Sequence, residues 1–234
     1  MLWGLRPIEP RAAYGLAVDL LQRQIHSGLL LPQERLPAER QLSDQFGISR
    51  VTLREALRVL ETSDYITVRR GAQGGAFVSD QERLNQLAHH RITRAPAEAM
   101  RVAEFISVNQ MAAARFAVER RGPAELKRMR QAGDMMRLAR TAPERRQAEA
   151  LFLLALGDAA HNALLSRAIA DGLAELFLPF EEAANLDSVE ATLQAYGQLF
   201  AALEAESLGE AEAAMANLNA LLWDRLRRIT RKAA

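Results

Sequence analysis

The chain has no cysteine, few aromatic residues and no long hydrophobic run. The absence of cysteine excludes disulfides, thiolate metal ligands and cysteine nucleophiles. No apolar stretch approaches the roughly 20 residues that a membrane-spanning helix needs, so we expect no membrane partner. Residues 1–7 lack the basic head and apolar stretch of a secretion signal. These absences predict a soluble, cytoplasmic protein.

The net positive charge is also small. The formal net charge is +1 and the isoelectric point is near 8.2, which are weak values for a chain that binds nucleic acid. The arginines are concentrated instead, because seven of them lie between residues 35 and 71, against five acidic residues. Any contact with nucleic acid must therefore depend on where these arginines stand rather than on a general positive field.

Catalytic motifs are missing as well. The sequence has no phosphate-binding glycine loop, no Gly-x-Ser-x-Gly motif and no His-Glu-x-x-His motif. The adjacent His89 and His90 would point about 100° apart on a helix and could not easily share a metal ion. His26 is expected at the surface. We therefore expect no enzymatic activity, no catalytic residue, no cofactor and no metal site.

The most informative stretch predicts two short helices joined by a tight turn. The first helix covers Ala38–Phe46, and Gly47 supplies the conformational freedom that the turn needs. Ser49 is the expected N-cap of the second helix. The apolar stripe of that second helix has the spacing i, i+3, i+4, i+7 and consists of Leu53, Ala56, Leu57 and Leu60.

Arginines occupy a different face of the second helix. Arg50, Arg54 and Arg58 repeat every four residues. A helix of this width fits the DNA major groove, where arginine can pair with guanine, and the free N–H groups at its start suit a phosphate. A basic amphipathic helix is more often a solvated surface, so this pattern by itself leaves both interpretations open.

A hairpin signal follows the two helices. Short β-prone runs at residues 65–68 and 76–78 flank a glycine-rich basic segment at residues 69–75. Helices followed by a two-stranded wing are the order of a winged helix-turn-helix. The combination of Pro37 before the first helix, the turn glycine and the basic wing favours DNA binding over a solvated surface.

These residues resemble the DNA-binding domain of the GntR family of bacterial transcription regulators, over about residues 12–79. Three motifs carry the resemblance: Leu36-Pro37-x-Glu39-Arg40-x-Leu42, Ser49-Arg50-x-Thr52-x-Arg54-Glu55-Ala56-Leu57, and Gly71 with Phe77-Val78. Gln33 and Ala38 depart from the family, which usually has a glycine and a capping serine or threonine at these positions. A missing cap costs on the order of 1 kcal/mol.

The resemblance implies a set of DNA contacts. Arg50, Thr52 and Arg54 would lie at bases or adjacent phosphates. The remaining contacts would be Arg40 and Ser49 at the DNA backbone, and Arg70 and Gly71 at the tip of the wing.

The rest of the chain is predicted to be almost entirely helical. Pro96, Pro123 and Pro143 each stand where a helix begins, a position that tolerates proline. The expected helices lie near 81–93, 96–121, 123–140, 144–161, 163–185, 188–205 and 208–231. Their repeated apolar positions predict an antiparallel bundle. The fold class is therefore mainly α, with a winged helix-turn-helix DNA-binding domain at residues 1–80 and an all-helical effector-binding and dimerisation domain at residues 81–234.

The helical half resembles the FCD domain of FadR-type regulators. Residues 113–126 and 196–203 anchor this resemblance. Many members bind a divalent metal through one aspartate and three histidines, and the matching positions here are Glu149, Leu153, Tyr196 and Leu218. Leucine has no lone pair and tyrosine is a poor ligand for the ordinary divalent ions, so only Glu149 could coordinate. We therefore expect the metal site to be lost.

The same resemblance implies an effector pocket, lined by those four residues together with Ile106 and Gln110. Ile106 stands where many members have an arginine that holds a carboxylate, and Gln110 replaces its usual acidic neighbour. These changes predict a more apolar pocket, which suits an acyl compound or another apolar acid derivative as effector.

The sequence thus predicts a homodimeric transcription regulator that binds a palindromic operator in double-stranded DNA under the control of a small-molecule effector. The alternative is a DNA-binding dimer whose helical half only dimerises, because leucines at the former metal positions would fill a core as readily as line a pocket. The presence or absence of a cavity distinguishes the two.

Overall fold

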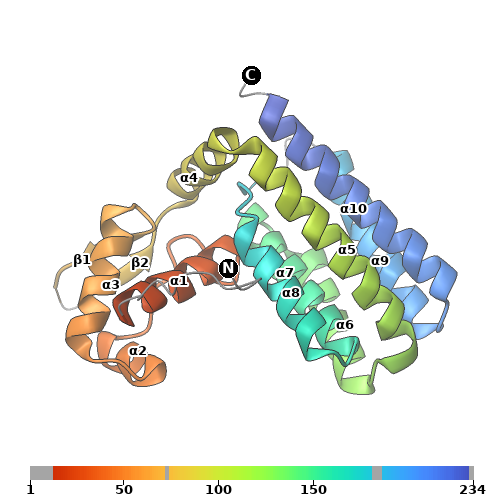
Figure 1. Cartoon of the computed structure of the whole chain (residues 1–234), viewed down its shortest axis with the longest axis horizontal. Helices are drawn as coiled ribbons and strands as arrows, with labels where there is room; N and C mark the ends of the chain where they lie inside the picture. The colour runs from red at the N-terminus through yellow and green to blue at the C-terminus, as the bar shows by residue number, and fades with distance from the viewer. Residues whose placement is uncertain (1–12, 72–73, 181–185, 232–234) are drawn as a thin grey trace, which may run out of the picture.

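A computed structural model of the chain describes residues 13–71, 74–180 and 186–231, and it has two lobes (Figure 1). The small lobe contains three helices and a two-stranded antiparallel sheet: α1 (Ala13–His26), α2 (Glu39–Phe46), α3 (Arg50–Thr62), β1 (Ile66–Arg69) and β2 (Gly75–Val78). The order confirms the predicted winged helix-turn-helix. Ala72 and Gln73 of the expected wing tip lie outside the described residues.

Local sequence signals explain the turn between α2 and α3. Gly47 adopts the left-handed conformation with φ of 65°, which a residue without a side chain reaches at little cost. The Ser49 hydroxyl then accepts a hydrogen bond from the backbone N–H of Thr52 at 3.1 Å and caps α3. Ala38 precedes α2 without a side-chain cap, in agreement with the expectation from the sequence.

The predicted apolar stripe of α3 forms the centre of the small-lobe core. Its four residues are buried and pack in one cluster with Leu21 and Ile25 of α1. The hairpin closes over this cluster, with Ile66 paired to Val78 in antiparallel register. This packing directs the opposite, arginine-bearing face of α3 outward.

The helical lobe is a bundle of six helices within the described residues: α5 (Pro96–Arg120), α6 (Pro123–Leu138), α7 (Ala142–Ala159), α8 (Ala163–Glu175), α9 (Leu186–Glu204) and α10 (Leu208–Arg231). Proline lies in the first turn of α5, α6 and α7, as predicted. Among the described helices, none is long and apolar enough to span a bilayer.

Helix α4 (Gln81–Arg94) connects the two lobes at the top of Figure 1. Its Leu84 and Ala88 are buried in the small-lobe core, whereas Ile92 packs in a separate cluster with Ala103 of α5 and Leu226 of α10. The connector is therefore packed at both ends.

One helix prediction is wrong. The sequence predicted a single helix over 163–185, but α8 ends at Glu175, and residues 176–180 contain no helix. Pro179 gives the physical reason, because a proline disfavours the helical conformation of the residue before it and cannot donate a backbone hydrogen bond. Residues 181–185 lie outside the described part of the chain.

Candidate DNA-binding surface and cavity of the helical lobe

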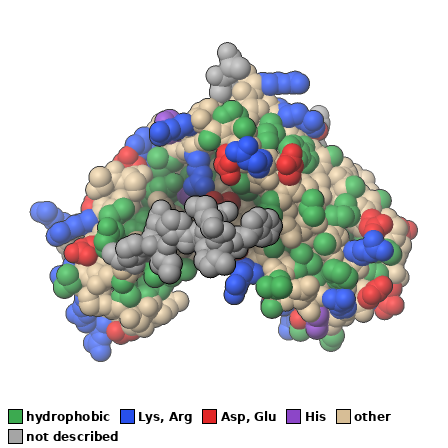
Figure 2. Space-filling model, viewed as in Figure 1, with side chains coloured by type: hydrophobic (Ala, Val, Ile, Leu, Met, Phe, Trp, Pro, Cys, Tyr) green, Lys and Arg blue, Asp and Glu red, His purple; other side chains and the backbone are tan. Residues whose placement is uncertain are grey.

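The outer face of α3 carries the predicted recognition residues. Ser49, Arg50, Arg54 and Arg58 are exposed, and Thr52 is half-buried. Figure 2 shows arginine side chains along the outer edge of the small lobe, where the hairpin and α2 lie in Figure 1. An exposed face of a single α-helix has the width that the DNA major groove admits.

The first turn of α3 leaves backbone donors free. The Thr52 N–H is occupied by the Ser49 hydroxyl, which also lies 2.8 Å from the Thr52 hydroxyl. The N–H groups of Arg50 and Val51 have no hydrogen-bond acceptor in the part of the chain that the structure describes. A helix start with two such donors and an adjacent arginine is suited to a phosphate oxygen.

The hairpin is braced by an arginine that the sequence interpretation missed. Arg35 donates a hydrogen bond to the Gly74 carbonyl, forms an isolated β-bridge with Phe77, and lies beneath Gly75, where an added Cβ would come within 3.1 Å of its Nε. Gly75 has φ of 143°, a backbone conformation that favours glycine, and a side chain there would also have to displace Arg35 slightly. In the sequence, the only signal for this structural role of Arg35 was its position beside the Leu36-Pro37 motif.

Arginines from α3, from β1 and from the loop before α2 line one groove between α3 and the hairpin. Its volume is about 360 Å³, and its basic lining consists of Arg35, Arg54, Arg58 and Arg69. The Arg69 guanidinium lies over the Phe77 ring, 4.4 Å from its centroid, which holds this side chain along β1. Arg40 is exposed on the first turn of α2, and Arg70 and Gly71 are exposed at the end of β1. The structure therefore brings the α2 and α3 residues together, with Arg70 and Gly71 on the neighbouring hairpin.

In the helical lobe, a cavity of about 100 Å³ lies among α5, α7, α9 and α10. All six residues of the predicted pocket line it: Ile106, Gln110, Glu149, Leu153, Tyr196 and Leu218. Gln110 and Tyr196 are buried. The structure thus brings the six residues together around one cavity, and their assignment to an effector pocket stays a prediction.

The lining of the cavity is not as apolar as expected, because Arg146 and Arg225 also contribute to it. Burial, followed by the positive charge of Arg225, lowers the pKa of Arg146 to about 10, and the negative charge of Glu149 opposes this shift. Arg146 still carries its proton at neutral pH. Burial also raises the pKa of Tyr196 well above its ordinary value, so this phenol is neutral.

The two arginines correct the prediction of an apolar pocket. Arg146 precedes Glu149 by three residues and Leu153 by seven, and Arg225 follows Leu218 by seven. Each arginine therefore shares a helix face with a residue already assigned to the pocket. This spacing was the signal that could have identified them.

The cavity residues do not fit a divalent metal. Glu149 is the only side chain at the four matching positions that binds such ions well, since two positions are leucine. No group of three or more histidine, cysteine, aspartate or glutamate side chains gathers anywhere among the described residues.

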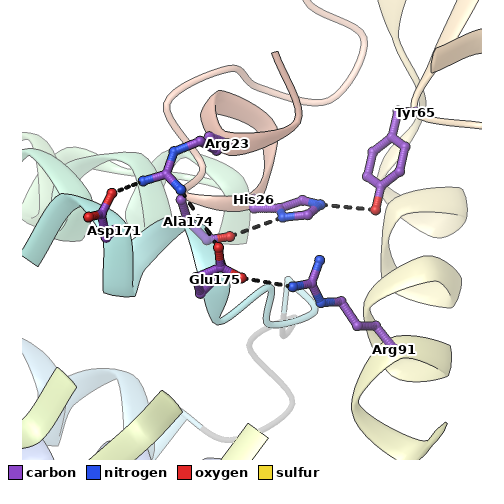
Figure 3. Close-up of polar contacts among 7 residues, drawn as sticks. All are labelled: Arg23, His26, Tyr65, Arg91, Asp171, Ala174 and Glu175. Carbon is purple, nitrogen blue, oxygen red and sulfur yellow. Dashed lines mark hydrogen bonds and ion pairs between the residues drawn. The ribbon is translucent and has the colours of Figure 1, made fainter. Parts of the chain in front are cut away.

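His26 does not lie at the surface, contrary to the expectation. It is buried at the end of α1. Its two ring nitrogens lie 3.0 Å from the Ala174 carbonyl and 2.9 Å from the Tyr65 hydroxyl, and Figure 3 shows it between these two residues. Its burial depends on α8, an element that lies some 140 residues further along the chain, and no local pattern indicates it.

Comparisons with known proteins agree with this geometry. Residues 13–78 match the family model described as bacterial regulatory proteins, gntR family, and residues 110–221 match the FCD domain. The HTH-type transcriptional regulator RmpR of Mycobacterium gastri is 30% identical over 183 residues, which cover 76% of this chain and 67% of that relative. The Exu regulon transcriptional regulator of Escherichia coli K12 is 39% identical over 105 residues, 43% of this chain and 40% of the relative.

Among solved structures, E. coli McbR/YncC superposes with a TM-score of 0.53 at 20% identity, over 94% of this chain and 99% of that one. At this identity the likeness shows the fold alone. The sequence matches show more, because they cover both the helix-turn-helix and the helical bundle. The chain belongs to the GntR family of bacterial transcription regulators, with an N-terminal DNA-binding domain of that family followed by an FCD domain.

Proposed function

We propose that the protein is a homodimeric regulator that binds a palindromic operator and releases or tightens it when a small anionic effector occupies the cavity of the helical lobe. The observation that carries the effector part is the pair Arg146 and Arg225 in that cavity. We further propose residues 1–80 as the DNA-binding domain and residues 81–234 as the effector-binding and dimerisation domain.

On DNA, α3 would lie in the major groove. Arg50 and Arg54 are the candidates for guanine contacts, with Thr52 at a base or an adjacent phosphate. Arg40, Ser49 and the free N–H groups at the start of α3 would hold the backbone, and the exposed Arg70 and Gly71 would reach a neighbouring minor groove or phosphate. The modest net charge of +1 predicts weak binding by one copy, so a dimer on two half-sites would supply useful affinity.

A dimer interface is proposed on α5 and α8, which pack against each other in the helical lobe. Three large apolar side chains on these helices are exposed, namely Phe105 at 46%, Val108 at 69% and Leu164 at 77%. Two-fold dimers bury one self-complementary patch, and an apolar patch supplies the free energy for it. Val108 and Leu164 are the most exposed large apolar residues of α5 and α8 in the part of the chain that the structure describes, so a second copy is the proposed occupant.

The proposed effector is a small carboxylate. Arg146 forms no hydrogen bond or ion pair with the residues that the structure describes, although it is half-buried and charged. A partly buried guanidinium with no hydrogen bond to the described residues can gain bidentate hydrogen bonds from an anion that matches its planar donors. The volume of about 100 Å³ is below the range of roughly 300–1,000 Å³ typical of pockets for larger ligands, which argues against a long acyl chain.

The same small volume favours one alternative, in which the helical lobe only dimerises. One experiment separates the two. The protein is selected against random duplexes at fixed salt, and the recovered duplex is then tested with small carboxylates, acyl compounds and buffer alone. We expect a palindromic consensus and a changed affinity with a carboxylate, lost in Arg146→Gln. A consensus indifferent to every compound would support the dimerisation-only function, and the absence of any consensus would refute the proposed operator.

A further inference from the structure

The segment 176–180, which follows α8, touches the cavity on one side and the small lobe on the other. Leu176 and Leu178 line the cavity. Phe177 and Phe180 are buried in the cluster that forms the small-lobe core. In a non-helical, extended chain, successive side chains point to opposite sides, which places Phe177 opposite Leu176 and Leu178. Phe180, which follows Pro179, does not obey this alternation and also packs on the small lobe. A short stretch of backbone thus separates the effector cavity from the core that supports α3.

On the small-lobe side, the contact with Phe177 is specific. Its ring stacks on His26 with centroids 4.2 Å apart, and His26 in turn bonds to Ala174 and Tyr65 (Figure 3). A carbonyl oxygen only accepts, so Nδ1 of His26 carries the proton and donates to Ala174. Nε2 then accepts from the Tyr65 hydroxyl. The end of α8 is therefore joined to both α1 and the residue before β1.

Ion pairs surround this stack. Arg23 of α1 pairs with Asp171 and lies 3.7 Å from Glu175, and Arg91 of α4 pairs with Glu175 at 3.1 Å (Figure 3). These pairs are partly exposed, so each contributes little free energy but restricts the direction in which α8 meets the small lobe.

Phe180 is held by α4. Its N–H donates to the Asn85 side-chain oxygen at 2.6 Å, and the Asn85 amide donates to the Phe180 carbonyl at 3.2 Å. This reciprocal pair fixes the far end of the segment to the connector between the lobes. Phe177 and Phe180 are consequently tied to the small lobe through different helices.

On the cavity side, Arg225 joins the cavity to the same segment. Its guanidinium lines the cavity and donates a hydrogen bond to the carbonyl of Pro179. An anion in the cavity would attract this guanidinium, and the hydrogen bond to the Pro179 carbonyl would weaken or change direction. A movement of the Pro179 backbone would also move Phe177 and Phe180, because these residues lie two positions before it and one position after it in the chain.

We propose that residues 176–180 set the position of the small lobe against the helical lobe and change it when the cavity is filled, with Phe177 and Arg225 as positioning residues. This inference rests on the proposed control of DNA binding from the cavity. Coupling of this kind requires that the occupant favours one arrangement of the lobes over the other.

The test uses the full chain and needs no identified effector. Because the chain has no cysteine, spin labels can be placed at Gln45→Cys on α2 and Leu138→Cys on α6, both exposed positions. Labelled protein is mixed with excess unlabelled protein so that each dimer carries one pair of labels. The distance between the lobes is then measured, together with the affinity for the selected operator.

Three variants change the segment or its surroundings. Arg225→Gln removes the charge that holds Pro179, Phe177→Leu shortens the contact with His26, and Ala150→Leu fills the cavity with extra side chain in place of a ligand. Arg130→Gln is the matched control, because Arg130 is an exposed arginine of the same lobe whose partners, Glu204 and the Phe200 ring, do not line the cavity. Circular dichroism establishes that each variant keeps its helices.

We expect Arg225→Gln, Phe177→Leu and Ala150→Leu to shift or broaden the interlobe distance and to change operator affinity by about 5-fold or more, the lower end of measured couplings. Arg130→Gln should change neither. We also expect Ala150→Leu to have no further effect in a Phe177→Leu background. If Ala150→Leu does not fold, Arg225→Gln still tests whether residues 176–180 control the interlobe distance and the operator affinity.

Two results keep this inference separate from the proposed function. If a carboxylate releases DNA while folded Arg225→Gln and Phe177→Leu keep the wild-type distance and response, the segment is not the coupling element and the inference is overturned. If no carboxylate acts but Ala150→Leu and Arg225→Gln both shift the distance and the affinity, the segment couples the lobes and the proposed effector class is wrong.

Discussion

Arg54 on the recognition helix donates from Nε to the Oε2 atom of Glu39, the first residue of α2, over 2.8 Å. This bond occupies the inner edge of the guanidinium and leaves the two terminal nitrogens for another acceptor. The ion pair is exposed, so its direct contribution to stability is small. Its importance is geometric, because it restricts where an otherwise flexible arginine can point.

We therefore predict that Glu39→Ala lowers discrimination between operator and unrelated DNA. Without Glu39, Arg54 loses this restraint, and the free energy of operator binding should become less favourable by about 1 kcal/mol or more, within the 1–3 kcal/mol expected for one bidentate base contact. Non-specific affinity should not fall, since a negative charge near the phosphates is removed. Affinities for the operator and for a scrambled duplex at the same salt give the ratio. An unchanged ratio would show that Glu39 does not position Arg54 on DNA.

If Arg50 reads guanine, Arg50→Ala should weaken operator binding by roughly 1–3 kcal/mol and relax the base preference at a single base pair of each half-site. The measurement is a repeat of the duplex selection with the variant. A uniform loss over all duplexes, with a lower salt dependence of binding, would instead identify Arg50 as a phosphate contact.

Much of the small lobe follows from local sequence. The αL turn at Gly47, the cap at Ser49 and the apolar stripe of α3 are short-range features, and each was predicted correctly. Local rules act within a few residues, so they fix where helices begin and end when a glycine, proline or cap is present.

The sequence failed to predict the non-helical segment 176–180 for the opposite reason. Residues 176–180 are all apolar, and a short apolar run fits a helix as well as an extended strand by pattern alone. Pro179 is a local signal against a helix here. The path of the segment depends in addition on tertiary packing, since Phe177 and Phe180 are buried by a lobe that precedes them in sequence by about 100 residues. The burial of His26 and the entry of Arg146 into the cavity depend on the same long-range packing.

Gln33 provides a stability prediction. Its φ of 63° lies in the left-handed region, where the family usually has glycine and where other residues are strained. Gln33→Gly should raise the free energy of unfolding by about 0.5–1 kcal/mol and raise Tm accordingly. Gln45→Gly inside α2 is the matched control and should lower stability by a similar amount. A lower Tm for Gln33→Gly would mean that the side chain contributes more than the backbone strain costs.

His26 predicts a dependence of stability on acid pH. Burial, followed by the positive charge of Arg91, lowers its pKa from 6.5 to about 4. The unfolded chain then binds more protons than the folded chain between these pH values, so stability is constant above pH 6.5 with respect to this group and falls as the pH drops toward 4. The loss from this group approaches about 3 kcal/mol at pH 4. Chemical unfolding at several pH values should show a flatter profile for His26→Gln than for the wild type. Equal slopes would indicate that His26 is solvated.

The proposed dimer interface makes a prediction about assembly. A buried glutamate without a partner carries a large desolvation cost, so Val108→Glu and Leu164→Glu should each convert the dimer to monomer at micromolar concentration. Leu138→Glu is the matched control, because Leu138 is exposed to 79% on α6, away from α5 and α8. Sedimentation velocity measures the oligomeric state, and operator affinity should fall with dissociation since each half-site then binds alone. Dimers that persist in both α5 and α8 variants but dissociate in Leu138→Glu would move the interface to α6.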